Sequence, residues 1–387
     1  MKQTILESLS ELSVADWCVL GIFVFVFLYR LYYLLFFFGR AVFRSHKEVI
    51  VNQKPRQAIT VFLTVRNEED NLRRLLPQLL TIKDVVYDVV VVDDYSLDNT
   101  YTVLGSFKQY PNFRFSSLNE ETRFSVKLAQ NIALKAAQND WVLPVPIETV
   151  EVGKDWINAF ASNTTTDNRN VMLGYSGIGI KPGIFNLLCR IESFLQQMRS
   201  FGYIANGIPF VYFEDNVAFR KEEYFKLGGY GQKTKEAYAN LELIINQFIT
   251  KKSTVLLFNE HARITKDIQT NRDDFYNLLN RSFRIEKYLP SWKRTLLGFD
   301  TFTNVLYTPL LAVVFIFYFN LWLPLTILAG VKILLHFVVL KITLNRLRER
   351  KIFISSLVYT WLMPYFKMVY KWYFNQSSRR SKWRIKV

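Results

Sequence analysis

Polar side chains follow two strand-like segments at the points where those segments end. The first segment, Ala58–Val65, is largely apolar and leads into the cluster TVRNEE, which covers 64–69. The second, Asp88–Val92, leads into Asp93–Thr100, which reads DDYSLDNT. A ligand of an open parallel sheet binds beyond the carboxyl ends of its strands. The two clusters therefore predict a binding site rich in carboxylates and amides at one edge of an α/β sheet.

The cysteines and histidines do not suggest another kind of chemistry. The two cysteines, Cys18 and Cys189, and the three histidines, His46, His261 and His336, are far apart in the chain. Their spacing fits neither a zinc finger, nor a disulfide framework, nor a Cys-His nucleophile pair. Both cysteines are interpreted as packing residues. Any chemistry must therefore rest on carboxylates, amides and basic groups.

Hydrophobic residues make up 50% of the 387-residue chain, and long apolar stretches lie near both ends. Trp17–Phe38 contains one charge, Arg30, and is close to the ~20 residues that cross a bilayer. The residues before it are acidic and no cleavage site follows it, so it is predicted to be an uncleaved anchor. Thr301–Phe319 and Leu321–Leu340 are predicted to be two more spans, with Asn320 in the turn between them.

The distribution of Lys and Arg predicts the orientation of these spans. Residues 1–16 are acidic and are placed outside the cell, and the anchor covers 17–38. Basic residues after the anchor place the α/β domain, 40–298, in the cytoplasm. Residues 301–340 then cross twice and return to a dense basic loop at 341–351. The chain is therefore predicted to be an integral protein of the cytoplasmic (inner) membrane.

The last hydrophobic stretch, 352–374, is interrupted by Pro364, Lys367 and Lys371, and the tail at 375–387 is basic. Because both flanks are basic, this stretch is predicted to lie in the membrane interface, with a third C-terminal span as the alternative. Much of the net charge of +16 is thus adjacent to the membrane, which predicts contact with anionic membrane lipids. The same distribution argues against a nucleic-acid partner.

The motifs and their order resemble those of family 2 glycosyltransferases, which have the Rossmann-like GT-A fold of nucleotide-diphospho-sugar transferases. In that family the first strand ends in a P-x-(R/Y)-N-E type turn and the second in D-D-x-S-x-D-x-T, which correspond here to 64–68 and 93–100. Lys127–Trp141 resembles the family's G-K-x-x-A-L-N-x-A helix, and Asn216–Tyr230 resembles its N-x-A-F-R-R-x-x-F-x-x-x-G-G-F segment. The likeness extends to the transmembrane helices that flank the domain.

The resemblance implies that the polar clusters line the uracil and ribose pocket of a nucleotide-diphosphate sugar, the donor substrate. The residues so implied are Thr64, Arg66, Glu68, Asp93, Asp94 and Ser96, with Lys127 near the donor or its phosphates. Carboxylates suit this role because they accept hydrogen bonds from the base imide and the ribose hydroxyls. The alternative is that Asp93, Asp94 and Asp98 only cap a helix that follows the strand.

The chain departs from the family pattern where a divalent cation is expected. The family's Asp-x-Asp motif holds such a cation, Mg²⁺ or Mn²⁺, on the diphosphate. The aligned residues here are Pro146-Ile147-Glu148, so one carboxylate remains. Glu148 is therefore the candidate metal ligand and a candidate catalytic residue, and the alternative is an exposed glutamate in a loop.

The catalytic base is also altered. The family base lies in an (S)-G-D-D or T-E-D motif before a helix and takes the proton from the acceptor hydroxyl. The aligned residues are Ala239-Asn240-Leu241, followed by Glu242, which would need a register shift to face the site. Glu214 and Asp215 are an acidic pair that is either a relocated base or a solvated turn. The family's Q-x-x-R-W motif is reduced to Arg281, which either approaches a phosphate or belongs to an interfacial helix.

Two functions are compatible with this pattern. The first is an inverting membrane glycosyltransferase of glycan or cell-envelope biosynthesis, which transfers a sugar from the nucleotide donor to a lipid-linked or membrane-proximal acceptor. The second is a catalytically degenerate homologue that binds a nucleotide or a partner membrane enzyme as a scaffold. The intact frame of the pocket favours the first, and the altered motifs favour the second.

Overall fold

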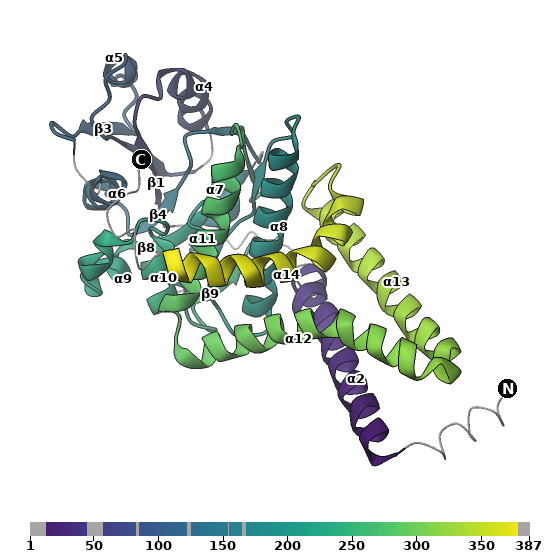
Figure 1. The fold of residues 1–387 in the computed structure, drawn as a ribbon. Coiled ribbons are helices and arrows are strands. Elements are labelled where there is room, and N and C mark those ends of the chain that lie inside the picture. The colour runs from purple at the N-terminus through teal and green to yellow at the C-terminus, as the bar shows by residue number, and fades with distance from the viewer. Residues whose placement is uncertain are drawn as a thin grey trace.

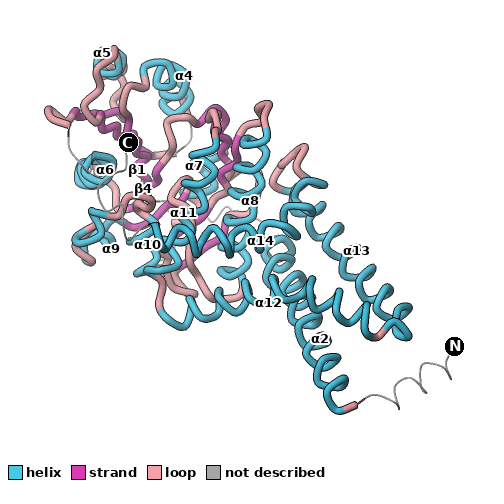
Figure 2. Tube along the Cα trace, viewed as in Figure 1, coloured by secondary structure: helices cyan, strands magenta, loops and turns pink. Residues whose placement is uncertain are grey.

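An α/β domain is joined to long apolar helices in the computed structural model of the chain (Figure 1). The structure describes residues 13–44, 57–82, 85–121, 125–153, 155–164 and 168–377. The predicted outer segment up to residue 12 and most of the basic tail, from residue 378, lie outside the described residues. Figure 2 shows that the strands all belong to the α/β part, whereas the remainder is helical.

In the described part of the chain, the main sheet has seven strands in the order β3-β2-β1-β4-β8-β6-β9, and a smaller sheet has the order β5-β10-β7. The strands of the main sheet are β1 Ile59–Val65, β2 Tyr87–Asp93, β3 Phe113–Ser117, β4 Trp141–Pro144, β6 Val171–Leu173, β8 Val217–Arg220 and β9 Thr254–Leu256. Those of the small sheet are β5 Thr149–Val152, β7 Ser176–Ile178 and β10 Ile264–Lys266. β1 pairs in parallel with β2 and β4, while β8 is antiparallel to β4 and β6.

Helices cover both faces of the main sheet because its central strands are apolar on both sides. Along β1, Val61 and Leu63 join one buried cluster and Phe62 joins the other, as the alternation of side chains in a strand requires. The helices of the domain are α4 Glu69–Leu80, α5 Thr100–Ser106, α6 Ser125–Ala136, α7 Trp156–Ala161, α8 Ile184–Ala205, α9 Lys221–Lys226, η2 Gly231–Lys235, α10 Glu242–Phe248 and α11 Arg272–Tyr288. This mixed sheet with helices on both faces agrees with the predicted α/β fold class.

Among the described residues, three helical segments are long and apolar enough to cross a membrane: Val14–Val42, Ser291–Phe317 and Phe319–Arg346. The first consists of α2 Val14–Tyr32, the π-helical η1 Tyr33–Gly39 and the start of α3 Arg40–Arg44. The others are α12 Ser291–Phe317 and α13 Trp322–Arg346, joined by η3 Phe319–Leu321. The predicted turn at Asn320 therefore lies where the helices meet.

Two predicted boundaries fall inside helices of the structure. α12 begins ten residues before 301, so the predicted end of the domain at 298 falls inside a helix. α13 continues to Arg346, so the first half of the predicted basic loop, 341–351, is helical. The helix persists because Leu340 and Leu344 are buried one turn apart, while Lys341 remains exposed.

We call the three apolar segments the membrane-type helices. Arg30, the charged residue of the first of them, has a partner on the second. Arg30 donates to Asp300 of α12 at 2.7 Å, and Arg199 of α8 donates to the same carboxylate at 3.0 Å. At the far end of the helices, Tyr318 donates to Asp16 at 2.7 Å. The start of α2 and the α12–α13 turn therefore lie together, away from the α/β domain (Figure 1).

The last helix, α14 Phe353–Ser377, is amphipathic. Its domain-facing side is polar: Tyr359 and Lys367 bind Glu192 of α8 at 2.5 and 2.7 Å, and Lys371 binds Glu286 of α11 at 2.9 Å. Its other side is exposed and apolar, and carries Ile354, Val358, Trp361, Leu362, Val369 and Trp372. Such a division is typical of helices that lie in a membrane interface, and an interfacial position stays the prediction for this stretch.

Candidate functional site

The turns that follow β1 and β2 are held together by reciprocal hydrogen bonds. β1 and β2 pair in register so that Val65 is opposite Asp93. The backbone N–H of Asn67 donates to Ser96 Oγ at 2.8 Å, and the backbone N–H of Leu97 donates to Asn67 Oδ1 at 2.7 Å. Asn67 has a positive φ of 54°, which asparagine tolerates better than most residues. The two polar clusters of the sequence therefore form one edge of the sheet.

Asp93 is buried at this edge and is fixed by two hydroxyl groups. Ser96 Oγ donates to it at 2.5 Å and Ser117 Oγ at 2.7 Å. These bonds fix the orientation of the carboxylate before any ligand binds. The alternative role for the aspartates was to cap the following helix, α5. The N-cap residue of α5 is Asn99, and the carboxylate that accepts from the first turn is that of Asp98, from Thr100 N–H at 2.9 Å.

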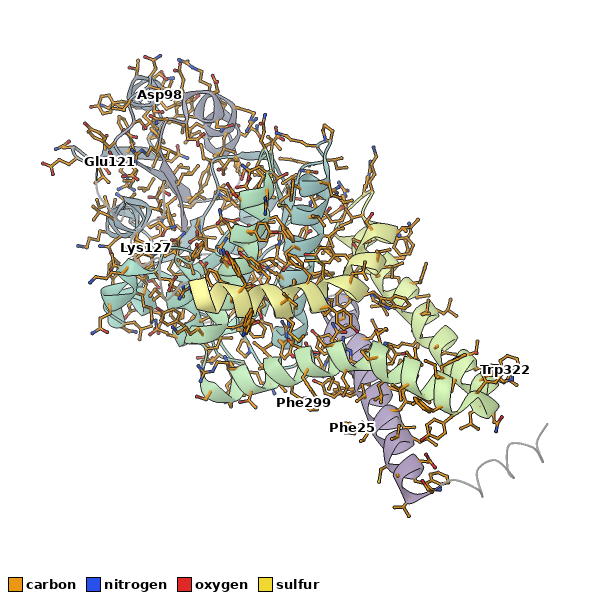
Figure 3. All side chains as sticks on the ribbon, viewed as in Figure 1. Phe25, Asp98, Glu121, Lys127, Phe299 and Trp322 are labelled. Carbon is orange, nitrogen blue, oxygen red and sulfur yellow. The ribbon has the colours of Figure 1, made fainter. Side chains whose placement is uncertain are left out.

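The other predicted nucleotide residues surround this edge. Thr64 is half-buried near the end of β1, and Asp94 is 4% exposed beside Asp93. Arg66 donates to Glu121 at 2.7 Å on the surface, and this hydrogen bond is the main reason that the pKa of Arg66 is raised. Figure 3 labels Asp98 and Glu121 on the same outer side of the domain. The edge thus offers carboxylates, hydroxyl groups and one guanidinium, which are groups that can bind a nucleoside.

Glu148 lies near Glu68, and together they provide few ligands for a metal ion. Burial raises the pKa of Glu68, Asn71 opposes the shift, and the charge of Glu148 adds to it. Within the described residues there is no group of three or more His, Cys, Asp or Glu side chains that could hold a metal. The described side chains therefore do not complete a metal site on their own.

A second cluster of charges lies at the start of β8. It combines the four predicted catalytic residues outside the Glu148 loop with a lysine: Glu214, Asp215, Glu242, Arg281 and Lys266. Arg281 of α11 contacts Glu242 at 2.6 Å and Glu214 at 3.7 Å, and Lys266 of β10 contacts Asp215 at 2.5 Å. Sequence segments that are far apart thus meet in one partly buried site.

The three carboxylates of this cluster differ in their availability to a substrate. Burial opposes ionisation of Asp215, but Lys266 outweighs it and lowers the pKa of that carboxyl. Glu242 is fully buried and bound to Arg281, so it does not face solvent. Burial and the charge of Glu242 raise the pKa of Glu214 to about 7, with Arg281 acting in the opposite direction. Glu214 is 13% exposed and is the carboxyl best suited to proton transfer near neutral pH.

Glu214 lies against the segment in which the resemblance places the catalytic base. Asn240 Nδ2 donates to its Oε1 at 3.0 Å, and the backbone N–H of Leu241 donates to its Oε2 at 3.0 Å. Gln130 of α6 donates to the same Oε2 at 3.1 Å. A carboxylate is therefore present beside 239–241 although that segment contains none itself.

The two clusters are adjacent along the sheet. The backbone N–H of Asn216 donates to the carbonyl of Pro144 at the end of β4, at 3.3 Å, and β4 is the neighbour of β1. Lys127 of α6 donates to the carbonyl of Glu236 and is 6% exposed. Burial lowers its pKa, against the charges of Glu242, Glu214 and Glu236. Lys127 is thus placed beside the acidic cluster, and Figure 3 shows it nearer to the membrane-type helices than Asp98 and Glu121 are.

Sequence reasoning missed Lys266, Gln130 and the partnership of Arg30 with Asp300. A signal for the last was present, because a lone arginine in a membrane helix requires a counter-charge and Asp300 borders the next hydrophobic segment. No local signal identifies Lys266 or Gln130, since each reaches its partner only through the tertiary fold.

Comparisons with known proteins bear on the family and the fold of the chain. Residues 60–145 match the family described as Glycosyl transferase family 2. Over 116 residues the chain is 28% identical to poly-beta-1,6-N-acetyl-D-glucosamine synthase of Staphylococcus aureus strain MSSA476. The matched segment covers 30% of this chain and only 28% of that protein. The fold is similar to that of mannosyltransferase PcManGT from Pyrobaculum calidifontis, solved with GDP-Man and Mn²⁺. That likeness has a TM-score of 0.52 at 15% identity and covers 89% of this chain and 99% of the other.

Proposed function

Because the chain carries a family 2 glycosyltransferase domain of the GT-A fold, we propose that it transfers a sugar from a nucleoside diphosphate donor to an acceptor at the membrane. The observation that carries the proposal is the placement of Glu214. This carboxyl lies against 239–241, its pKa is raised to about 7, and it borders the edge of the sheet that holds Asp93. The sheet edge proposed to bind the nucleotide and a titratable base are therefore neighbours.

The donor side of the reaction uses the edge formed by β1 and β2. Asp93 and Asp94 accept hydrogen bonds from the base and ribose of the donor, and Thr64, Arg66, Glu68 and Ser96 complete the pocket. The cross-bonds between Asn67, Ser96 and Leu97 support this role, because they pre-order the pocket. Two relatives have names or titles that specify a sugar: one is an N-acetylglucosamine polymer synthase and the other was solved with GDP-Man.

On the acceptor side, Glu214 acts as the general base. It takes the proton from an acceptor hydroxyl, the hydroxyl oxygen forms a bond to the anomeric carbon, and the bond from that carbon to the diphosphate breaks. The nucleoside diphosphate leaves with the electron pair, and one displacement inverts the anomeric configuration. Asn240, Leu241 N–H and Gln130 orient the carboxylate, and Arg281 limits the repulsion from Glu242.

The membrane-type helices place this chemistry next to a bilayer. We infer that the domain lies in the cytoplasm, because the basic residues adjoin it and the acidic start of α2 lies with the α12–α13 turn at the opposite end. The acceptor is accordingly lipid-linked or close to the membrane, as in glycan or cell-envelope synthesis.

One observation favours a scaffold without activity as the second candidate. The Asp-x-Asp position holds Pro146 and Glu148, and the described residues contain no metal-ligand group. A partner-binding homologue that has kept the nucleotide pocket would have these features.

A nucleotide titration of the full-length protein in detergent tests the proposal. UDP, GDP and their sugars are titrated with Mn²⁺ and with a chelator, on the wild type and on Glu148→Gln. We expect micromolar binding of one nucleotide and release of its diphosphate when a membrane extract supplies acceptors. Binding without turnover would favour the scaffold, and no binding of any nucleotide would refute both roles. Equal affinity in Glu148→Gln with Mn²⁺ would remove Glu148 as a metal ligand.

A further inference from the structure

A cavity of about 920 Å³ lies between the α/β domain and the membrane-type helices. Its walls come from α8, α11, α12 and α14, which adjoin one another in Figure 1. The cavity is separate from the edge formed by β1 and β2. Its position at the junction of the domain with the apolar helices places it at the expected level of the lipid headgroups.

One wall of the cavity is strongly basic. Its basic residues are Arg199, Arg284, Lys287, Arg294, Lys367 and Lys371, against two carboxylates, Glu192 and Glu286. Lys367 is paired with Glu192 at 2.7 Å and Lys371 with Glu286 at 2.9 Å. In the described part of the chain, Lys287 and Arg294 form no ion pair with a carboxylate. The wall therefore carries an excess of positive charge, which is complementary to a phosphate group.

A second part of the lining is apolar, and it belongs to the same helices, α12 and α14, that carry Arg294, Lys367 and Lys371. α12 contributes Phe302, Val305 and Pro309, and α14 contributes Met368 and Trp372. Phe302, Met368 and Trp372 are each more than half exposed, so this wall continues onto the outer apolar surface of the helices. A molecule that fills the cavity must combine an anionic head with a hydrocarbon chain.

The cavity also leads toward the acidic cluster. Tyr212 and Gln196 line both this cavity and a smaller one that is bordered by Asp215, Lys266 and Arg281. Tyr212 is two residues from Glu214 in the chain. The polar end of the large cavity thus adjoins the acceptor side of the proposed reaction.

We propose that this cavity binds the phosphate headgroup of a membrane lipid, whose chains lie against α12 and α14. The inference deepens the proposed transferase function, because it names the acceptor or its carrier as a lipid phosphate, and it rests on that function for its role in transfer. The binding itself requires no catalysis. Lys287 and Arg294 supply the free positive charge, and α12 supplies the apolar surface.

Native mass spectrometry of the full-length protein tests the inference with phosphatidic acid as the probe and phosphatidylcholine as the comparison lipid. We expect retention of phosphatidic acid in preference to phosphatidylcholine, and a loss of about tenfold or more in the Lys287→Gln/Arg294→Gln double variant, because each cation near a phosphate surface contributes measurably. The Lys135→Gln variant removes a charge from α6, away from the cavity, and should bind as the wild type does. Val305→Trp fills the apolar wall without changing charge and should also weaken binding.

Undiminished phosphatidic acid binding in the double variant would overturn the inference. It would equally be overturned if inorganic phosphate displaced half of the lipid at an equal concentration, because the chains would then contribute nothing to the affinity. Nucleotide titration of the same samples separates this inference from the proposed function. If the wild type binds no nucleotide, the transferase function is refuted. If it binds nucleotide but does not prefer phosphatidic acid to phosphatidylcholine, the lipid site alone is refuted.

Discussion

Replacing Glu214 with glutamine removes the titratable carboxyl and keeps the size and shape of the side chain. The wild-type carboxylate accepts hydrogen bonds from Asn240, Leu241 N–H and Gln130 at 3.0 to 3.1 Å. A glutamine oxygen still accepts from one or two of these donors, so the local structure should persist. The variant therefore tests proton transfer more directly than an alanine would.

The expected loss of rate follows from the role of a general base. Removal of such a base lowers kcat by roughly 10²–10⁴-fold, which corresponds to about 3–5 kcal/mol in the activation barrier. The base must be unprotonated to act, and burial raises its pKa to about 7. Wild-type kcat should therefore rise about tenfold per pH unit below pH 7 and level off above it. The Glu214→Gln variant should show no such rise.

Stability provides an independent readout of the same group. A folded-state pKa above the ordinary value of 4.5 means that protonated Glu214 favours the fold, and that this stability is lost as the pH rises through about 7. The full loss amounts to roughly 3 kcal/mol. Glu214→Gln should therefore melt at the same temperature as the wild type or higher at about pH 8.

The assay measures release of the nucleoside diphosphate from the donor between about pH 6 and 8 in detergent with membrane extract as acceptor. Glu222→Gln is the matched control, because Glu222 is an exposed glutamate on α9 that pairs only with Lys226 among the described residues. If Glu214→Gln kept most of its activity, or kept the same dependence on pH, the assignment of the base would be wrong.

Three further variants follow from specific contacts. Asp93→Asn should weaken nucleotide binding about 10–100-fold by calorimetry, because the oriented carboxylate loses its charge, and unchanged affinity would contradict the donor site. Asp300→Asn should lower stability by about 3–5 kcal/mol in thermal melts, since Arg30 loses its buried counter-charge, and an unchanged melt would show that the pair is solvated. Gly202→Ala should destabilise the packing of α8 on η1, because an added Cβ would lie 2.1 Å from the carbonyl oxygen of Phe37, whereas Gly105→Ala has open space and serves as the control.

The frame of the domain could be predicted from the sequence because its signals are local. The run of valines in β2 and the leucines of α4 specify burial by their spacing alone, and the motifs after β1 and β2 fall at strand ends. Parallel pairing then brings 64–69 and 93–100 together without further information. The helices near 298 and 341–351 extend beyond the predicted segments, because polar residues continue a helix wherever one face stays buried.

The acidic cluster could be predicted only in part. Glu214, Asp215, Glu242 and Arg281 were identified singly, but which carboxyl is free depends on contacts between distant segments. Lys266 neutralises Asp215 and Arg281 neutralises Glu242, and both relations exist only after β10 and α11 have packed. Glu214 differs from the other two carboxyls because it is buried beside a second acid, Glu242, and accepts hydrogen bonds from three neutral donors.

The membrane part and the catalytic cluster are mechanically connected through α14. Glu286 of α11 accepts from Lys371 of α14 at 2.9 Å and from Tyr212 at 2.9 Å, and Tyr212 precedes Glu214 by two residues. Glu192 is 1% exposed, so removal of Lys367 would leave a buried carboxylate without its counter-charge. A domain cut off before the membrane-type helices would leave Glu192 without Lys367, and Glu286 would keep Arg199 but lose Lys371. The position of α14 against the bilayer therefore helps to set the position of the proposed base, which ties sugar transfer to the membrane surface.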